Sequence, residues 1–265
     1  MVSRIVVPLD ESAFSEAAIP VADELASAIG AEVVLLAAGW GSTVEELQTY
    51  LDSKVTAFAG AVSTAVSPDT FPATAIADAL DSADDAVVMS THGRSGIGRA
   101  LLGSVAEDVL HRTDQAVMLL GPKVSEFTSF KGRTLAVSTD GSPVSSIILP
   151  RAAAWAKVLD MTVRIVSVTA AGGTPIGGEE PEILERAVSS AVAYFTELGI
   201  SAESASILGG DASESIVDWI DSNDVGLFAM ATHGRGGLAR TALGSTTMKV
   251  VHDSPCPVLV QKSTR

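Results

Sequence analysis

Short runs of apolar, largely β-branched residues alternate along the chain with longer segments in which apolar residues recur at helical spacing. Residues 4–9 (RIVVPL) form the first such run, and residues 32–38 (EVVLLAA) form the second. Between them, apolar positions three and four residues apart predict a helix that is capped by Ser15 and ends at Gly30. Continuous apolar runs of this length are typical of strands buried on both faces of a parallel sheet.

The same alternation continues to the end of the chain. A long helix is predicted over residues 43–62 and a shorter one over residues 104–112. Further strands are predicted at residues 86–90, 116–120, 135–139, 163–168, 226–231 and 257–261. Strands that alternate with helices predict an α/β fold, in which an open parallel sheet carries helices on both faces. Ligands of such sheets bind at the carboxyl ends of the strands.

The chain also repeats itself. The segment STHGRSG at 90–96 matches ATHGRGG at 231–237, and all four histidines fall into matched pairs with one common offset. Asp10 matches Asp140 near the two starts at a shorter offset, so the second copy carries about eleven extra residues, much of which we place in a Gly- and Pro-rich loop at 170–181.

The segment between the two copies, GPKVSEFTSFKG at 121–132, begins and ends with glycine and reads as a linker. The sequence therefore predicts two tandem domains, at 1–123 and 132–265.

Composition narrows the range of partners. The formal net charge of −15 repels nucleic acid and anionic membranes, although a single phosphate can still be held by local backbone N–H groups. One cysteine permits no internal disulfide. We expect no secretion signal, because the start at MVSRIVVPLD leads directly into a strand pattern, and no apolar run approaches the length of a membrane span. We expect a cytoplasmic protein without a nucleic-acid or membrane partner.

The clearest candidate chemistry lies after the strand predicted at 86–90, where a glycine-rich loop leads into a helix. Helix starts offer unpaired N–H groups, and glycines let the backbone approach an anion closely. The alternative is that the glycines only shape a tight turn, but identical spacing in two copies favours a phosphate cradle. The candidate residues are Gly93, Arg94, Gly96, Arg99, Gly103 and Ser104 in the first copy, and Gly234, Arg235, Gly237, Arg240, Gly244, Ser245 and Thr246 in the second.

Two other phosphate motifs are excluded. No lysine precedes Ser104, as a Walker A loop requires, and no G-x-G-x-x-G follows the first strand. Asp10 and Asp140, each at the end of a first strand, are candidates to accept hydrogen bonds from a ribose or adenine edge; the alternative is an Asx-type turn.

Catalytic and metal sites are not indicated. We interpret His92 and its partner His233 as residues that fix the loop, and His111 and His252 as favourable charges at helix ends. Cys256 is interpreted as a small packing residue.

These motifs resemble those of the universal stress protein family. Its signature G-x2-G-x9-G-[ST] matches at Gly93 and Gly103-Ser104, and again at Gly234 and Gly244-Ser245, with small residues in place of the leading glycine. The first-strand pattern V-P-x-D-x-S is also present at residues 7–12.

The resemblance implies two tandem, open, parallel five-stranded sheets of the Rossmann-like, adenine nucleotide alpha hydrolase-like type. It implies ATP, alone or with Mg²⁺, between the first-strand aspartate and the glycine loop. Val168 would flank the adenine in the second copy, and Ala38 holds that place in the first. It also implies pairing of the two copies within the chain, and it is compatible with a homodimer.

The two copies differ in their likeness to the family. Glu11 replaces the usual glycine after Asp10, and SPDTFP at 67–72 stands where the second copy has Gly209-Gly210-Asp211. We therefore expect the second copy to be the better site. The function expected is a nucleotide-dependent stress regulator with at most slow ATP hydrolysis or autophosphorylation. The alternatives are a nucleotide-free interaction module, and a nucleotide-dependent enzyme of the wider fold group.

Overall fold

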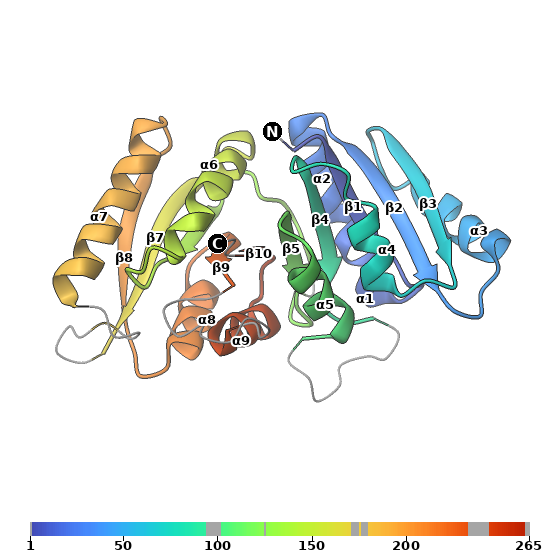
Figure 1. Ribbon diagram of the computed structural model, residues 1–265. Helices are drawn as coiled ribbons and strands as arrows, with labels where there is room; N and C mark the ends of the chain where they lie inside the picture. The colour runs from blue at the N-terminus through green and yellow to red at the C-terminus, as the bar shows by residue number, and fades with distance from the viewer. Residues whose placement is uncertain are drawn as a thin grey trace. The chain divides into compact units, whose positions relative to one another are not determined.

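The computed structural model of the chain describes residues 2–93, 102–124, 126–170, 175, 180–232 and 244–262 (Figure 1). The chain divides into two compact units, Met1–Thr128 and Ser129–Arg265. Each unit consists of a parallel sheet whose strands alternate with helices, so the predicted α/β class is confirmed.

Unit 1 has the strand order β3-β2-β1-β4-β5, and all neighbouring strands are parallel. Its strands are β1 (Arg4–Pro8), β2 (Glu32–Gly39), β3 (Val62–Pro68), β4 (Asp85–Ser90) and β5 (Ala116–Leu120). Its helices are α1 (Ala13–Glu16), α2 (Ala18–Ile29), α3 (Val44–Val55), α4 (Pro72–Asp78) and α5 (Ser104–Arg112).

Unit 2 repeats this topology with the order β8-β7-β6-β9-β10. Its strands are β6 (Thr134–Ser138), β7 (Thr162–Thr169), β8 (Ala202–Leu208), β9 (Val225–Ala231) and β10 (Val258–Gln261). Its helices are the 3₁₀ helix η1 (Ser145–Ile148) and the α-helices α6 (Leu149–Val158), α7 (Pro181–Glu197), α8 (Ala212–Ser222) and α9 (Ser245–Asp253).

The first strand of each unit lies in the middle of its sheet. Ile5, Val6 and Val7 in β1 are fully buried, as are their counterparts in β6, because helices cover both faces (Figure 1). Ala18, Val21 and Ala22 on the inner side of α2 are also fully buried, and their small side chains let the helix approach the sheet closely.

The third strand of each unit was missed, and the helix predicted over 43–62 is wrong after Val55. Helix α3 ends at Val55, and Val62 begins β3. Strands β3 and β8 lie at the edges of their sheets, where many residues are half-buried or exposed. Their sequences therefore carry polar residues and lack the continuous apolar run that marks a central strand.

The predicted helix cap is also corrected. Ser12, not Ser15, caps the first helix: its Oγ accepts a hydrogen bond from the Ser15 backbone N–H at 3.1 Å. The predicted single helix is two helices, because α1 is one short turn and α2 begins after Ala17 without a side-chain cap.

The insertion predicted at 170–181 lies largely outside the described residues. In the described part of the chain, none of the helices has the length and apolar character needed to cross a membrane.

Candidate functional site

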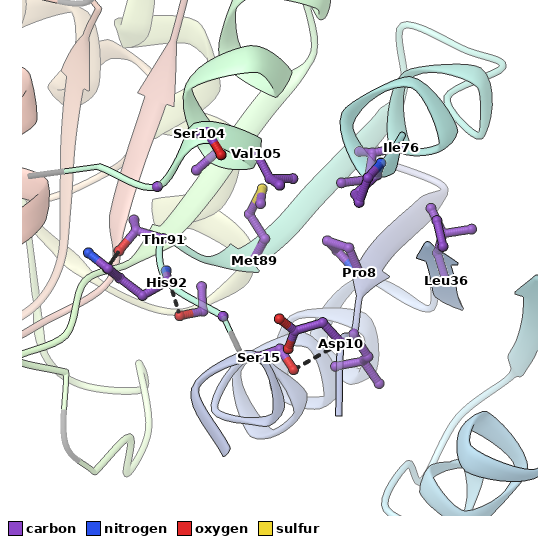
Figure 2. Close-up of a pocket in the computed structure, with 17 residues that line it drawn as sticks. Pro8, Asp10, Ser15, Leu36, Ile76, Met89, Thr91, His92, Ser104 and Val105 are labelled. Atoms are coloured by element: carbon purple, nitrogen blue, oxygen red, sulfur yellow. Dashed lines mark hydrogen bonds between the residues drawn. The ribbon is translucent and has the colours of Figure 1, made fainter. Parts of the chain in front are cut away.

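The strand order places a switch point between β1 and β4 in unit 1, because the connections from these neighbouring strands run in opposite directions. A cavity of about 360 Å³ lies at their carboxyl ends. Figure 2 shows its apolar and polar side chains around one space. The apolar wall includes Pro8, Leu36, Ala38, Ile76, Met89 and Val105, and the polar residues are Asp10, Ser15, Ser90, Thr91, His92 and Ser104.

Asp10 is held at the cavity by the turn that follows β1. Its Oδ1 accepts hydrogen bonds from the Ser12 backbone N–H at 3.1 Å and the Ser12 hydroxyl at 2.5 Å. Asp140 makes the same two bonds with Ser142, at 3.0 and 2.6 Å. The Asx-type turn considered from the sequence is thus present in both units, and it fixes the orientation of the carboxylate.

Gly93 lies directly against this carboxylate. A Cβ atom at position 93 would overlap Oδ2 of Asp10 and would lie 3.0 Å from its Cγ. The glycine therefore permits the first-strand aspartate and the loop after β4 to meet, and a larger residue at 93 would displace the Asp10 carboxylate.

Gly103 closes the same loop at its far end. Its backbone N–H donates to the Thr91 carbonyl at 3.0 Å, and a Cβ atom there would overlap that carbonyl oxygen. In unit 2, the Gly244 N–H donates to the Thr232 carbonyl at the same distance. Both loops are therefore pinched at their base by one backbone hydrogen bond.

Helix α5 begins immediately after this pinch, with Gly103 as its N-cap and no side-chain cap. The first intrahelical hydrogen bond runs from the Glu107 N–H to the Gly103 carbonyl at 3.0 Å. The N–H groups that come before Glu107 in the first turn therefore take no part in the i to i−4 bonding of the helix. Ser104 is exposed at the first helical position and does not cap the helix. The first turn also lines the cavity, which gives it the polarity of an anion site.

The three histidines in the described part of the chain occupy positions that are consistent with structural roles. His92 is buried beside the cavity, and its Nδ1 lies 2.8 Å from the Thr91 hydroxyl. His111 and His252 stand in the last turns of α5 and α9, as predicted. Among the described residues there is no group of three or more side chains that could hold a metal ion.

Cys256 is buried, in line with the interpretation as a packing residue. Burial raises the pKa of its thiol to about 11.

The structure brings four of the predicted site residues of unit 1 to one cavity: Asp10, Gly93, Gly103 and Ser104. In unit 2, Asp140 follows β6, Val168 lies near the end of β7, and Gly244, Ser245 and Thr246 begin α9, all at the carboxyl edge of the sheet. The other predicted residues lie outside the described part of the chain: Arg94, Gly96, Arg99, Gly234, Arg235, Gly237 and Arg240.

Sequence reasoning missed Thr91 and Tyr50. Thr91 and Thr232 share the offset of the glycine motifs, so the repeat itself could have identified them. Tyr50 lines a second cavity of about 210 Å³ with Glu11 and Leu47. Its hydroxyl donates to Glu16 Oε1 at 3.0 Å, and burial together with this carboxylate raises the pKa of the tyrosine.

Together, these features define a class of protein: tandem doubly wound α/β units with an acidic turn after the first strand and a glycine-pinched loop that enters a helix at the switch point. The universal stress protein family model matches residues 40–121 and 132–262. The chain therefore belongs to the universal stress protein family, and the resemblance and the tandem arrangement read from the sequence are confirmed.

Individual relatives agree with this assignment. A universal stress protein of Methanocaldococcus jannaschii is 31% identical over 140 residues, which span 49% of this chain and 82% of the relative. One of Mycobacterium tuberculosis is 28% identical over 193 residues, which span 66% of this chain and 61% of the relative. The crystal structure of a universal stress protein from Archaeoglobus fulgidus superposes with a TM-score of 0.74 over 99% of both chains; at 20% identity it shows a shared fold.

Proposed function

We propose that this chain is an adenine-nucleotide-binding stress regulator, whose bound nucleotide, ATP alone or with Mg²⁺, alters its conformation or its choice of partner. The observation that carries this proposal is one cavity of unit 1, where Asp10, an apolar wall and the first turn of α5 meet.

The three parts of the cavity fit the three parts of a nucleotide. The apolar wall of Leu36, Ile76 and Met89 suits a base, which is planar and poorly hydrated on its faces (Figure 2). The Asp10 carboxylate is an acceptor for ribose hydroxyls. The first turn of α5 carries the N–H groups and the positive dipole end that suit a phosphate.

The same arrangement in unit 2 supports a second site. Asp140 accepts the same two turn hydrogen bonds as Asp10. The Gly244 N–H closes its loop with the same backbone hydrogen bond as the Gly103 N–H. Thr246 adds a hydroxyl in the first turn of α9. Because Gly141 stands in unit 2 where unit 1 has Glu11, we propose that the unit 2 site tolerates the charge of a triphosphate better.

The hydrogen bonding of the histidine in the cavity supports a regulatory role over rapid turnover. Histidine is the side chain that most often acts as a general base, and the His92 that lines this cavity has its Nδ1 2.8 Å from the Thr91 hydroxyl. We propose that any hydrolysis is slow and that the protein acts through the bound and free states.

The direct test is to denature gently purified protein and identify the released nucleotide, and then to titrate stripped protein with Mg-ATP by calorimetry. We expect ATP or ADP to be released, and we expect Asp140→Glu and Gly234→Val to weaken binding while the fold is kept. Asp218→Glu, at an exposed position on α8, is the matched control.

No released nucleotide, together with no heat of binding, would favour the nucleotide-free interaction module. Rapid multiple turnover of ATP would favour an enzyme. Unchanged affinity in both variants would show that the site in unit 2 is misplaced.

A further inference from the structure

Unit 1 has non-glycine residues with positive φ and an uncapped helix start at positions where unit 2 has residues that suit the local conformation. Glu11 has a φ of 67°, a left-handed conformation that glycine adopts most easily, and Gly141 has a φ of 84° at the matched position. Asp69, in the connection from β3 to α4, also has a positive φ, of 52°. Strained residues of this kind concentrate at functional sites.

The start of α4 departs from its counterpart in the same way. Phe71 is the N-cap of α4 and makes no capping hydrogen bond. Asp211 is the N-cap of α8, and its Oδ1 accepts from the N–H groups of Ser213 and Glu214 at 3.0 and 3.1 Å. Both caps stand three residues beyond the last paired residue of the edge strand, so they are equivalent positions. Unit 1 thus places an aromatic residue where a capping residue would be more stable.

Phe71 forms an exposed aromatic pair with Trp40. The ring centroids are 5.7 Å apart with an interplanar angle of 66°, yet Trp40 is 61% exposed and Phe71 is 67% exposed. The Asp69 N–H donates to the Gly39 carbonyl at 2.8 Å, which ties the two segments together. The pair is therefore held in place by the backbone while its faces remain open to solvent.

Trp40 and Phe71 are adjacent in the chain to residues that line a second cavity of unit 1. Gly39 precedes Trp40, Pro72 follows Phe71, and both line the second cavity of unit 1. That cavity shares Leu9, Asp10, Ala38 and Pro72 with the first one. The two cavities are therefore neighbours that share part of their lining, and Glu11 belongs to the second one.

We propose that Trp40 and Phe71 form an aromatic platform that contacts the base of a nucleotide bound in unit 1, and that they make this site depend on the base more than on the phosphates. This inference rests on the proposed function. An aromatic ring offers a stacking face to any purine, whereas Glu11, which lines the second cavity, adds a negative charge that disfavours a highly charged polyphosphate. Adenosine and AMP are therefore expected to bind unit 1 nearly as well as ATP.

The test measures AMP binding by calorimetry and by tryptophan fluorescence. Trp155 and Trp219 belong to unit 2, so the difference between the native protein and Trp40→Phe isolates the signal of Trp40. We expect AMP to quench this signal, and we expect Trp40→Ala and Phe71→Asp to weaken AMP binding about tenfold, as loss of a stacked ring does. Leu208→Ala, which removes an exposed apolar side chain from unit 2, is the matched control.

Phe71→Asp separates recognition from folding. Aspartate restores the N-cap that unit 2 has, so the variant is expected to raise the melting temperature of unit 1 while it lowers the affinity for adenosine, which has no charge for the new carboxylate to repel. A purely structural role for Phe71 would move both quantities in the same direction.

If AMP binds the native protein but quenches no Trp40 signal, and both variants keep native affinity, the platform is refuted and the proposed function stands. If the native protein binds neither AMP nor ATP, the proposed function fails and the platform fails with it.

Discussion

Gly93 and Gly103 are confined by their neighbours and not by their backbone angles. The space for a Cβ at position 93 is taken by the Asp10 carboxylate, and at position 103 it is taken by the Thr91 carbonyl. The two neighbouring groups differ in mobility. The Asp10 carboxylate can rotate about its side-chain bonds, whereas the Thr91 carbonyl can move only if the backbone at the end of β4 moves with it. Substitution at 103 should therefore disturb the fold, and substitution at 93 should mainly disturb the site.

We expect Gly103→Ala to destabilise unit 1 by about 1–3 kcal/mol, the usual penalty for an atom forced into occupied space. Gly60→Ala is the control, because the space around Gly60 is open and its φ is not positive. That variant should be neutral or slightly stabilising. Urea denaturation followed by circular dichroism measures both. Equal stability of the two variants would contradict the pinch at Gly103.

The residue types at this site were readable from the sequence, but one of their contacts was not. The repeat and the family motif singled out Asp10 and Gly93 separately. Their direct contact depends on β1 and β4 being neighbours in the sheet, and the pattern of apolar residues does not determine the order of the strands. For the same reason Tyr50 was missed, because α3 brings it to the cavity from a segment without any motif.

At the scale of elements, each unit uses an arginine–aspartate pair at the amino end of its sheet, but only one pair is buried. Asp85 begins β4, and its Oδ2 accepts from Arg4 at 2.9 Å and from two backbone N–H groups. Asp224, which precedes β9, pairs with Arg133 at 2.8 Å. The Asp85 side chain is 3% exposed and the Asp224 side chain is 75% exposed.

This difference in burial predicts a difference in stability. Asp85→Asn leaves a partly buried guanidinium without its nearest countercharge and should cost about 2 kcal/mol of unfolding free energy. Asp224→Asn should cost less than about 1 kcal/mol, because water screens an exposed pair. Urea titrations of both variants at the same pH provide the measurement. A larger loss in Asp224→Asn than in Asp85→Asn would overturn this account.

The elements that the sequence revealed are the ones that tertiary structure buries most. Central strands such as β1 and β6 carry continuous apolar runs, so their position was predicted to within a residue. The edge strands β3 and β8 are half-buried, and their mixed composition let the predicted helix after Thr43 run into Val62. The error follows from exposure, which weakens the periodic signal on which such predictions depend.

For the whole molecule, the net charge of −15 acts against every anionic ligand. A phosphate cradle is local and short-ranged, whereas the repulsion is long-ranged and is screened by salt over a Debye length of about 10 Å at 0.1 M. The two contributions therefore respond differently to ionic strength.

We expect the affinity for Mg-ATP to rise about twofold when NaCl is raised from about 20 mM to about 150 mM, since salt screens the repulsion more than the contacts in the cradle. Adenosine, which carries no charge, is the control and should bind equally at both concentrations. Calorimetric titrations at constant Mg²⁺ measure the change. A fall in Mg-ATP affinity with salt would show that local arginines outweigh the net charge.

The sequence by itself determined the duplication, the alternation of strands and helices, and the residue types at the carboxyl ends of the strands. These features are local, because each depends on the spacing of residues within a segment or on its repetition. Only the tertiary structure decided that Asp10 touches Gly93, that Gly103 is pinned by Thr91, and that Trp40 stands against Phe71. The first and third of these contacts join segments that are distant in the chain and are brought together by sheet order and packing, and the second closes a loop whose path the spacing of its residues does not specify.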